Sequence, residues 1–130
     1  MPAVETDFWQ LTIPEEWQVD TDDASVVMAD PDGLGSISIT TLQFDAEVSG
    51  DQALEVAADA GCPEADAKWT DLAGADCWYF EFEDDGEYLR EWYVPRKDQL
   101  LLVSYACDPD DADMDRDMVD EILDGLAYAL

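Results

Sequence analysis

Apolar and polar residues alternate along the first third of the chain, which is the pattern of β-strands buried on one face. Strands are predicted over residues 8–13, 24–29 and 36–44, with turns at residues 20–23 and 30–33. In the last of these strands the apolar residues change phase, from Ile37 and Ile39 to Leu42 and Phe44. That change predicts a β-bulge near residues 40–41.

A helix is predicted after the third strand. Ser49-Gly50-Asp51-Gln52 has the form of a capping box, in which the serine side chain accepts a hydrogen bond from the N3 amide. Gly61 suits the C′ position at the other end. The small apolar residues at helical spacing are Ala53, Leu54, Ala57 and Ala58. So narrow a face is expected to pack close to a sheet. A further strand is predicted over residues 68–72, with a break at Gly74.

The densest aromatic segment, residues 77–107, has the pattern of a β-meander: three strands joined by two tight turns. Asp85-Gly86 is the signal of a two-residue hairpin. The second turn is predicted at residues 95–98. Residues 99–107 are apolar on both faces, so this strand is expected at the centre of the sheet with cover above and below.

The register of the hairpin sorts its side chains onto two faces. It puts Glu81 opposite Arg90, a favourable cross-strand pair. One face is apolar and holds Trp78, Phe80, Phe82, Leu89 and Tyr93. The other face is mixed and holds Tyr79, Tyr88 and Trp92 together with Glu81, Glu83 and Arg90.

An amphipathic helix is predicted at the end of the chain, capped by Asp113 and rich in acids in its first turn. Its apolar stripe, at a spacing of about 3.6 residues, consists of Met114, Met118, Val119, Ile122, Leu123, Leu126 and Leu130. No internal repeat or linker is found, so residues 1–130 are expected to form one domain. The predicted class is α+β: a single-domain α/β/α sandwich on a mostly antiparallel six-stranded sheet, with a β-meander and a C-terminal amphipathic helix.

The composition supports a packed core but is strongly acidic. Of the 130 residues, 48% are hydrophobic and 11% aromatic, which excludes a disordered chain. The 34 acidic residues outnumber 5 basic ones, leaving a formal net charge of −29. On a surface of about 7,000 Å² these charges lie ~15 Å apart, beyond the Debye length of about 8 Å at physiological salt. Such a surface repels nucleic acid and anionic lipid, and it speeds encounter with basic proteins.

Two other causes of the acidity stay open. One cause is origin in a salt-adapted cytoplasm, where acidic surfaces are general. The other is that the acids serve only solubility. The excess of Asp over Glu and the scarcity of Lys favour salt adaptation. Three Cys and five Trp in a short chain fit it less well.

A cytoplasmic protein is expected. The N-terminal segment has no basic region followed by an apolar run, so no signal peptide is predicted. No segment approaches the ~20 apolar residues of a membrane span. Cys62, Cys77 and Cys107 are odd in number and lack metal-ligand spacing, so reduced thiols are expected. A disulfide between Cys77 and Cys107 across the sheet is the alternative.

No catalytic or cofactor motif is found. The chain has no His, which removes His-based triads and His metal sites. Carboxylate pairs are frequent, but glycosidase-type chemistry needs one buried acid in a cleft. Asp111-x-Asp113-x-Asp115 matches an EF-hand start, yet Arg116 stands where the loop needs Gly and Ile122 where it needs Glu. We therefore expect no enzyme, no cofactor and no metal site, and interpret this loop as a helix cap.

Two segments resemble the PsbP-like superfamily. FWQLTIPEEW resembles its apolar-x-apolar-x-Ile-Pro-x-x-Trp opening, and WYFEFEDDGEYLREWYVPRKDQLLLVSYAC resembles its later meander. The superfamily includes the photosystem II protein PsbP, a Ran-binding nuclear import factor, DcrB-type lipoproteins and the Eag chaperones of type VI secretion. The resemblance covers most of the chain in layout and implies a non-enzymatic α/β/α sandwich that binds other proteins. Its matching positions are core and turn residues, so no family binding residue is carried over.

The candidate binding site is the mixed face of the hairpin with its acidic tip. It comprises Tyr79, Glu81, Glu83, Asp84, Asp85, Glu87, Tyr88 and Trp92. In one interpretation a helix or the N-terminal segment covers the aromatic side chains. In the other they stay partly exposed as anchors, and the acids act as a steering field.

The favoured function is a cytoplasmic, non-enzymatic protein-binding domain, monomeric or homodimeric, with a basic protein partner. Among PsbP-like proteins two roles fit best: an immunity protein that blocks a basic toxin, or a secretion chaperone or adaptor that holds an effector. The alternative is a housekeeping α/β domain whose acidity is salt adaptation. A calcium-responsive module is a third, less favoured class.

Overall fold

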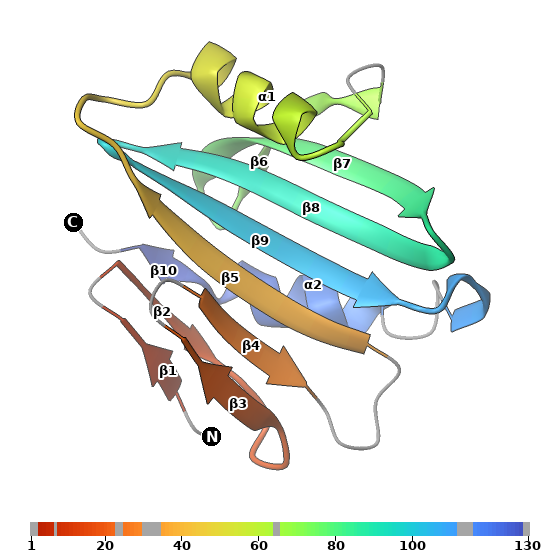
Figure 1. Cartoon of the computed structure of the whole chain (residues 1–130). Helices are drawn as coiled ribbons and strands as arrows, with labels where there is room; N and C mark the ends of the chain where they lie inside the picture. Colours follow the sequence, from red (N-terminus) through yellow and green to blue (C-terminus); the bar gives the residue numbers. More distant parts are fainter. Residues whose placement is uncertain are drawn as a thin grey trace.

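The computed structural model describes residues 3–6, 8–22, 25–29, 35–63, 66–111 and 116–128. Its centre is a seven-stranded antiparallel sheet in the order β3-β4-β5-β9-β8-β7-β6 (Figure 1). The strands are β3 (Gln18–Thr21), β4 (Ser25–Ala29), β5 (Gly35–Gln43), β6 (Lys68–Leu72), β7 (Ala75–Asp84), β8 (Glu87–Arg96) and β9 (Gln99–Cys107).

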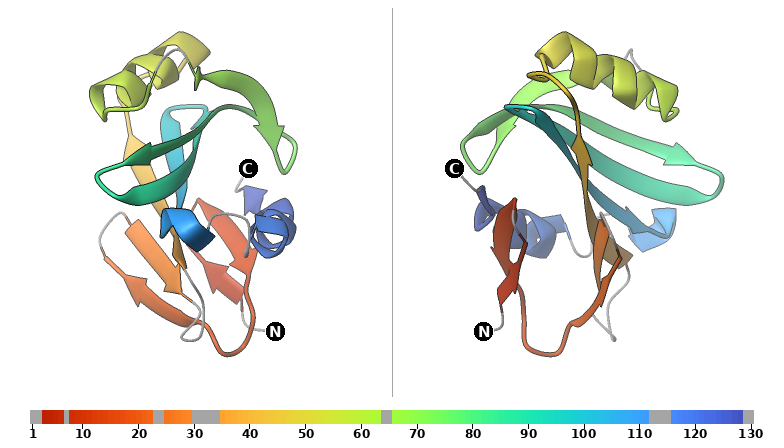
Figure 2. Two further views of the ribbon diagram at one scale, coloured as in Figure 1. Left: turned by 90° about the vertical axis from the view of Figure 1, so that its right-hand side faces the viewer. Right: turned by 60° about the vertical axis from the view of Figure 1, so that its left-hand side comes forward.

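Each face of this sheet has its own cover (Figure 2). Helix α1 (Gly50–Asp59) packs on β7 and β8. The other face is covered by helix α2 (Arg116–Asp124) and by a three-stranded sheet in the order β1-β2-β10. The remaining elements are β1 (Ala3–Glu5), β2 (Trp9–Thr12), β10 (Ala127–Tyr128) and a short 3-10 helix, η2 (Pro109–Asp111).

The strand count corrects the predicted six-stranded sheet, because the chain divides its strands between two sheets. The predicted strand at residues 8–13 is β2 of the small sheet. Residues 20–21, predicted as part of a turn, extend β3, where Asp20 pairs with Val27 of β4. Alternation shows that a segment is half-buried but does not identify its partner strand. The α+β class and the mostly antiparallel order are confirmed.

β5 pairs with β9 in one unbroken register along its whole length, so the predicted bulge is wrong. The change of apolar phase has another cause: the sheet is covered on both faces. Ile39 and Thr41 are buried toward the side of α2. Leu42 and Phe44 pack in the core under α1.

The meander forms as predicted, with Glu81 opposite Arg90. Its first turn has the left-handed backbone of a type I′ hairpin, with φ of 51° at Asp85 and 84° at Gly86. The second turn is shorter than predicted, because Pro95 and the residue after it still pair with β9. β9 is the middle strand of the sheet, as its doubly apolar sequence predicts.

α1 begins as predicted, since the backbone N–H of Gln52 donates to Oγ of Ser49 at 3.1 Å. After the helix, Gly61 has a φ of 98°, which suits glycine. The buried residues of the helix are Ala53 and Ala57. Ala58 is exposed, so the buried stripe is narrower than predicted.

α2 is shorter than the predicted helix. It ends at Asp124, and after Gly125 the chain becomes extended, so that Ala127 pairs with Gln10 of β2. Leu126 is 4% exposed and still belongs to the core. The apolar stripe continued past the helix because the extended segment also faces the core.

Some predicted features fall outside the described residues. They are the turn at residues 30–33, the helix cap Asp113, the stripe residues Met114 and Leu130, and most of the EF-hand-like loop.

The three cysteines are buried. Cys77 carries a free thiol, so the alternative disulfide with Cys107 is not formed. Burial raises the pKa of the Cys62 thiol to about 11 and that of Cys77 to about 12. Both thiols are therefore protonated at neutral pH.

Candidate functional site

The predicted binding residues lie along the β7–β8 hairpin, but they do not form one exposed surface. The carboxylates at its tip are exposed: Glu83, Asp84, Asp85 and Glu87. The aromatic side chains turn inward. Trp92 is 5% exposed, Tyr88 is 7% exposed and Tyr79 is half-buried. Of the two interpretations of the mixed face, the structure has the one in which other elements cover these rings.

Arg116, at the start of α2, attaches this helix to the hairpin. Its Nη2 donates to Oε1 of Glu81 at 2.9 Å, and its Nη1 donates to Oε2 at 3.1 Å. Nη1 also donates to the hydroxyl of Tyr88 at 3.0 Å. The helix thus uses one predicted binding residue as its ion-pair partner and covers another.

Arg90 makes a second attachment from the sheet. It is 4% exposed, and its Nη2 donates to Oδ1 of Asp120 on α2 at 2.7 Å. Its Nε donates to the hydroxyl of Tyr79 at 2.8 Å. The guanidinium carbon lies 4.8 Å from the centre of the Trp92 ring, within cation–π range. The mixed face of the hairpin therefore holds a buried cation.

These contacts fix the charge of Glu81. Hydrogen bonds from Arg116 lower the pKa of this carboxyl to about 2, against the opposing effect of burial, and Tyr79 donates to it at 2.7 Å. The carboxylate is ionised throughout the physiological range, so it cannot serve as a general acid near neutral pH. Two of the 5 basic residues of the chain hold α2 against the sheet.

One group of acids lies together at one end of the sheet. The tip of the β7–β8 hairpin and η2 lie at the same end (Figure 1). η2 and the residue before it add Asp108, Asp110 and Asp111 to the carboxylates of the tip. We call these seven residues, Glu83, Asp84, Asp85, Glu87, Asp108, Asp110 and Asp111, the acidic end.

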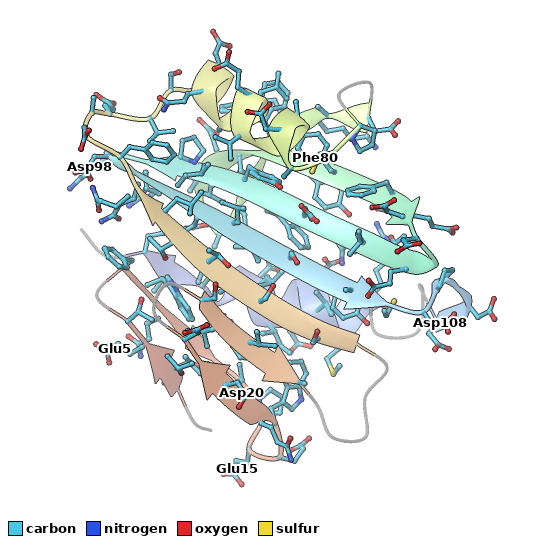
Figure 3. All side chains as sticks on the ribbon, viewed as in Figure 1. Glu5, Glu15, Asp20, Phe80, Asp98 and Asp108 are labelled. Carbon is cyan, nitrogen blue, oxygen red and sulfur yellow. The ribbon has the colours of Figure 1, made fainter. Side chains whose placement is uncertain are left out.

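The opposite end of the meander carries two of the basic residues of the chain. The turn between β8 and β9 carries Arg96 and Lys97. Figure 3 shows Asp98 of this turn and Asp108 of the acidic end on opposite sides of the molecule. Arg96 and Lys97 therefore lie at the other end of the meander from the acidic end.

A hollow beside the tip of the hairpin belongs to the same region. It has a volume of about 540 Å³ and is lined by the loop after α1 and by β7. Its lining residues include Asp66, Glu81, Glu83 and Asp84. The hollow is open and acidic, which suits a cationic side chain better than an apolar ligand.

Trp69 is an exposed aromatic residue that the sequence did not single out. It lies on β6 and is 50% exposed. The available signal was its context, Lys-Trp-Thr-Asp, in which every neighbour is polar. A tryptophan in such a segment has little apolar sequence around it to share a core.

The described residues show no constellation for metal or membrane chemistry. They hold no group of three His, Cys, Asp or Glu side chains that could bind a metal ion. Across the same residues, no helix combines the length and the apolar character needed to cross a bilayer.

Comparison with known proteins shows similarity in structure only. No protein-family model matches the chain, and no curated protein matches it. A crystal structure from Bacteroides thetaiotaomicron VPI-5482 superposes with a TM-score of 0.67 at 16% identity, over 92% of this chain. This chain spans 44% of the length of that protein.

Two further solved structures are similar over most of both chains. Cyanobacterial PsbP (CyanoP) from Synechocystis sp. PCC 6803 has a TM-score of 0.64 at 13% identity, covering 94% of this chain and 87% of its own. LpqN, involved in cell envelope biogenesis of Mycobacterium tuberculosis, has a TM-score of 0.56 at 15% identity, covering 92% and 82%. The chain has a PsbP-like fold, as the sequence resemblance implied.

Proposed function

We propose that this protein is a non-enzymatic protein-binding domain that docks a basic partner on the acidic end. The observation that supports the proposal is the gathering of seven carboxylates at one end of the sheet, away from Arg96 and Lys97. Solubility alone gives no reason for the grouping of these seven carboxylates.

Binding begins with electrostatic steering. A basic partner approaches the acidic end along the field of its carboxylates. Steering of this kind raises the association rate constant and makes it fall with ionic strength. The fixed network of Glu81, Arg90 and Arg116 holds α2 in place and keeps the hairpin rigid while the tip carboxylates meet the partner.

The finer role that we propose is an immunity protein for a basic toxin or a chaperone or adaptor for a secreted effector. Both roles need a preformed acidic surface and no chemistry. They differ in their gene neighbours, because a toxin reading frame beside this one favours immunity and an effector frame favours the chaperone.

The test compares two variants with the same change in net charge. In the first, the tip is neutralised by Glu83→Gln, Asp84→Asn, Asp85→Asn and Glu87→Gln. In the matched control, exposed acids far from the meander are neutralised by Glu5→Gln, Glu15→Gln, Glu16→Gln and Asp20→Asn (Figure 3). Association with poly-L-lysine is measured by stopped-flow fluorescence at several salt concentrations.

The tip variant is expected to associate roughly tenfold more slowly at low salt, and the control to change much less. Equal slowing in both variants would show that only net charge matters, which would leave salt adaptation as the explanation of the acidity. If the association rate of the native chain does not depend on ionic strength, the electrostatic mechanism itself is refuted.

A further inference from the structure

β6 is the last strand of the seven-stranded sheet, and its outer edge is exposed (Figure 2). Four of its five residues are exposed, the exception being Leu72. One of them is Trp69, at 50% the most exposed of the large hydrophobic side chains in the described part of the chain. An open sheet edge is a template for pairing with another chain, and this one carries an exposed aromatic side chain.

The Trp69 ring packs against a side chain that is itself held in place. Its ring centre lies 5.0 Å from that of Trp78, the opposite residue on β7, in an edge-to-face arrangement. The Trp78 indole is held in turn, because its Nε1 donates to the carbonyl of Gly50 at 2.8 Å. A Cβ at Gly50 would lie 3.2 Å from the Trp69 ring, so glycine permits the close approach of α1. The exposed indole is therefore held in one orientation, which lowers the entropy lost on binding.

A pair of carboxylates lies beside the indole on the same face of the hairpin. Asp71 is two residues after Trp69, and it pairs directly with Asp76 on β7. Both are exposed. Like charges opposite each other across two strands destabilise the pairing. A cation above this pair removes the repulsion, and a cation above the neighbouring indole gains a cation–π contact.

The turn between β6 and β7 determines which backbone groups of β6 point toward the open edge of the sheet. Ala73 and Gly74 have φ of 50° and 91°, a two-residue type I′ turn between β6 and β7. Such a turn makes its flanking pair a hydrogen-bonded one, and hydrogen-bonded pairs then alternate with non-hydrogen-bonded pairs. Trp69 and Asp71 fall on the non-hydrogen-bonded positions, so their N–H and C=O groups point away from β7, toward the open edge.

We propose that β6 binds an extended segment of the basic partner, which adds a strand to the sheet and places two arginines on the Trp69 side. In an added strand, alternate residues share a face, so an Arg-x-Arg segment puts one guanidinium over the indole and the next beside Asp71 and Asp76. Arginine fits better than lysine, because its planar guanidinium stacks on indole and binds carboxylate in a bidentate way. The inference rests on the proposed function and specifies the recognised segment.

The test uses a fluorescent peptide of about eight residues with the core Thr-Arg-Val-Arg-Thr, whose binding to the native chain is followed by anisotropy. A second peptide of the same composition carries its arginines side by side, on opposite faces of a strand. A third carries N-methyl groups on alternate residues, which block strand addition but keep the charge. The chain variants are Trp69→Thr and the pair Asp71→Asn with Asp76→Asn. The control is Val19→Thr, an exposed apolar residue on the opposite edge strand β3.

Both β6 variants are expected to bind the alternating peptide roughly tenfold more weakly, as for a contact at the centre of an interface. The Val19→Thr variant should bind like the native chain, and the other two peptides should bind poorly. Circular dichroism and thermal unfolding check that the variants stay folded, which is expected because all four substituted positions are exposed.

Native-like binding by Trp69→Thr would overturn the inference. So would equal binding of the N-methylated peptide, since that leaves only charge attraction. If peptide binding instead disappears in the tip variant, the acidic end is the docking site, and the proposed function survives without β6. If neither the peptide nor poly-L-lysine associates with the native chain, both the inference and the proposed function fail.

Discussion

Removing the carboxylate of Asp120 is expected to destabilise the protein, although the change also reduces an unusually large negative charge. The Asp120 carboxylate lies 2.7 Å from Nη2 of Arg90, whose side chain is 5% exposed. The variant Asp120→Ala leaves this guanidinium buried without its counter-ion. Charge count alone predicts the opposite sign, because an acidic chain gains from losing an acid.

The size of the effect follows from the exposure of the two partners. Two unit charges about 4 Å apart attract by ~4 kcal/mol at an effective dielectric constant of about 20. Asp120 is 49% exposed, so solvent screens part of this attraction. The Tyr79 hydroxyl and the Trp92 ring continue to stabilise the cation. We expect a loss of about 2 kcal/mol, below the ~3–5 kcal/mol for breaking a fully buried pair.

Replacing Arg90 should lower the free energy of unfolding less than replacing Asp120. Arg90→Met removes the buried charge together with the ion pair and keeps most of the apolar contact with Trp92. The half-exposed Asp120 is then hydrated, so the expected loss is about 1 kcal/mol. The double variant should lose less than the sum of the single losses, as expected for residues in direct contact.

The assay is urea unfolding followed by tryptophan fluorescence at neutral pH and physiological ionic strength. Glu121→Ala, an exposed acid on the same helix, is the control for the change in charge. The reasoning is refuted if Asp120→Ala and Glu121→Ala behave alike, or if Arg90→Met is the more destabilising of the two pair variants.

Three further predictions concern the site and its support. Glu81 has a lowered pKa, so its contribution to stability is present above about pH 4.5 and is lost as the pH falls toward about 2. The stability difference from Glu81→Gln, about 1 kcal/mol at neutral pH once solvent screening is allowed for, should vanish over that range in thermal unfolding; a constant difference would contradict the role of Arg116. Ser49→Ala removes the acceptor for the Gln52 amide and should lower stability by about 1 kcal/mol in urea, whereas Ser49→Asn should not. Cys77, fully buried with a raised pKa, should resist iodoacetamide near neutral pH until urea unfolds the chain, as judged by mass spectrometry; rapid labelling of the folded protein would show that the sheet opens there.

Local signals predicted the first turn of the meander and the capped end of α1 well. Asp85-Gly86 forms the expected hairpin, and the register that it sets puts Glu81 opposite Arg90. Ser49 caps α1 as expected. These features depend on residues close in sequence, because turn geometry and capping are satisfied within a few positions of the chain.

Features that need distant partners were predicted less well. The phase change in β5 predicts a bulge, but it reflects cover on both faces, with Leu42 packed under α1. The apolar stripe of the last helix continued past Asp124, where the chain leaves the helix and joins β2. In each case the apolar pattern showed which residues are buried and left open the element that buries them.

The candidate site divides in the same way. The acidic tip could be predicted from the sequence, since charged residues at a hairpin turn are exposed in almost any fold. The sequence did not show that Trp92 and Tyr88 are covered, because α2, which lies far along the chain, covers them. The exposure of Trp69 had a weak signal in its polar neighbours.

The sequence by itself determined the strands of the meander, its hairpin register, the start of α1 and the acidic character of any surface that the chain presents. Only the tertiary structure decided which aromatic residues meet solvent. Two arginines on different elements bind α2 over one face of the hairpin, whereas β6 is the last strand of its sheet and four of its residues are exposed. The physical reason is that exposure depends on contacts between segments far apart in the chain, which local periodicity does not encode.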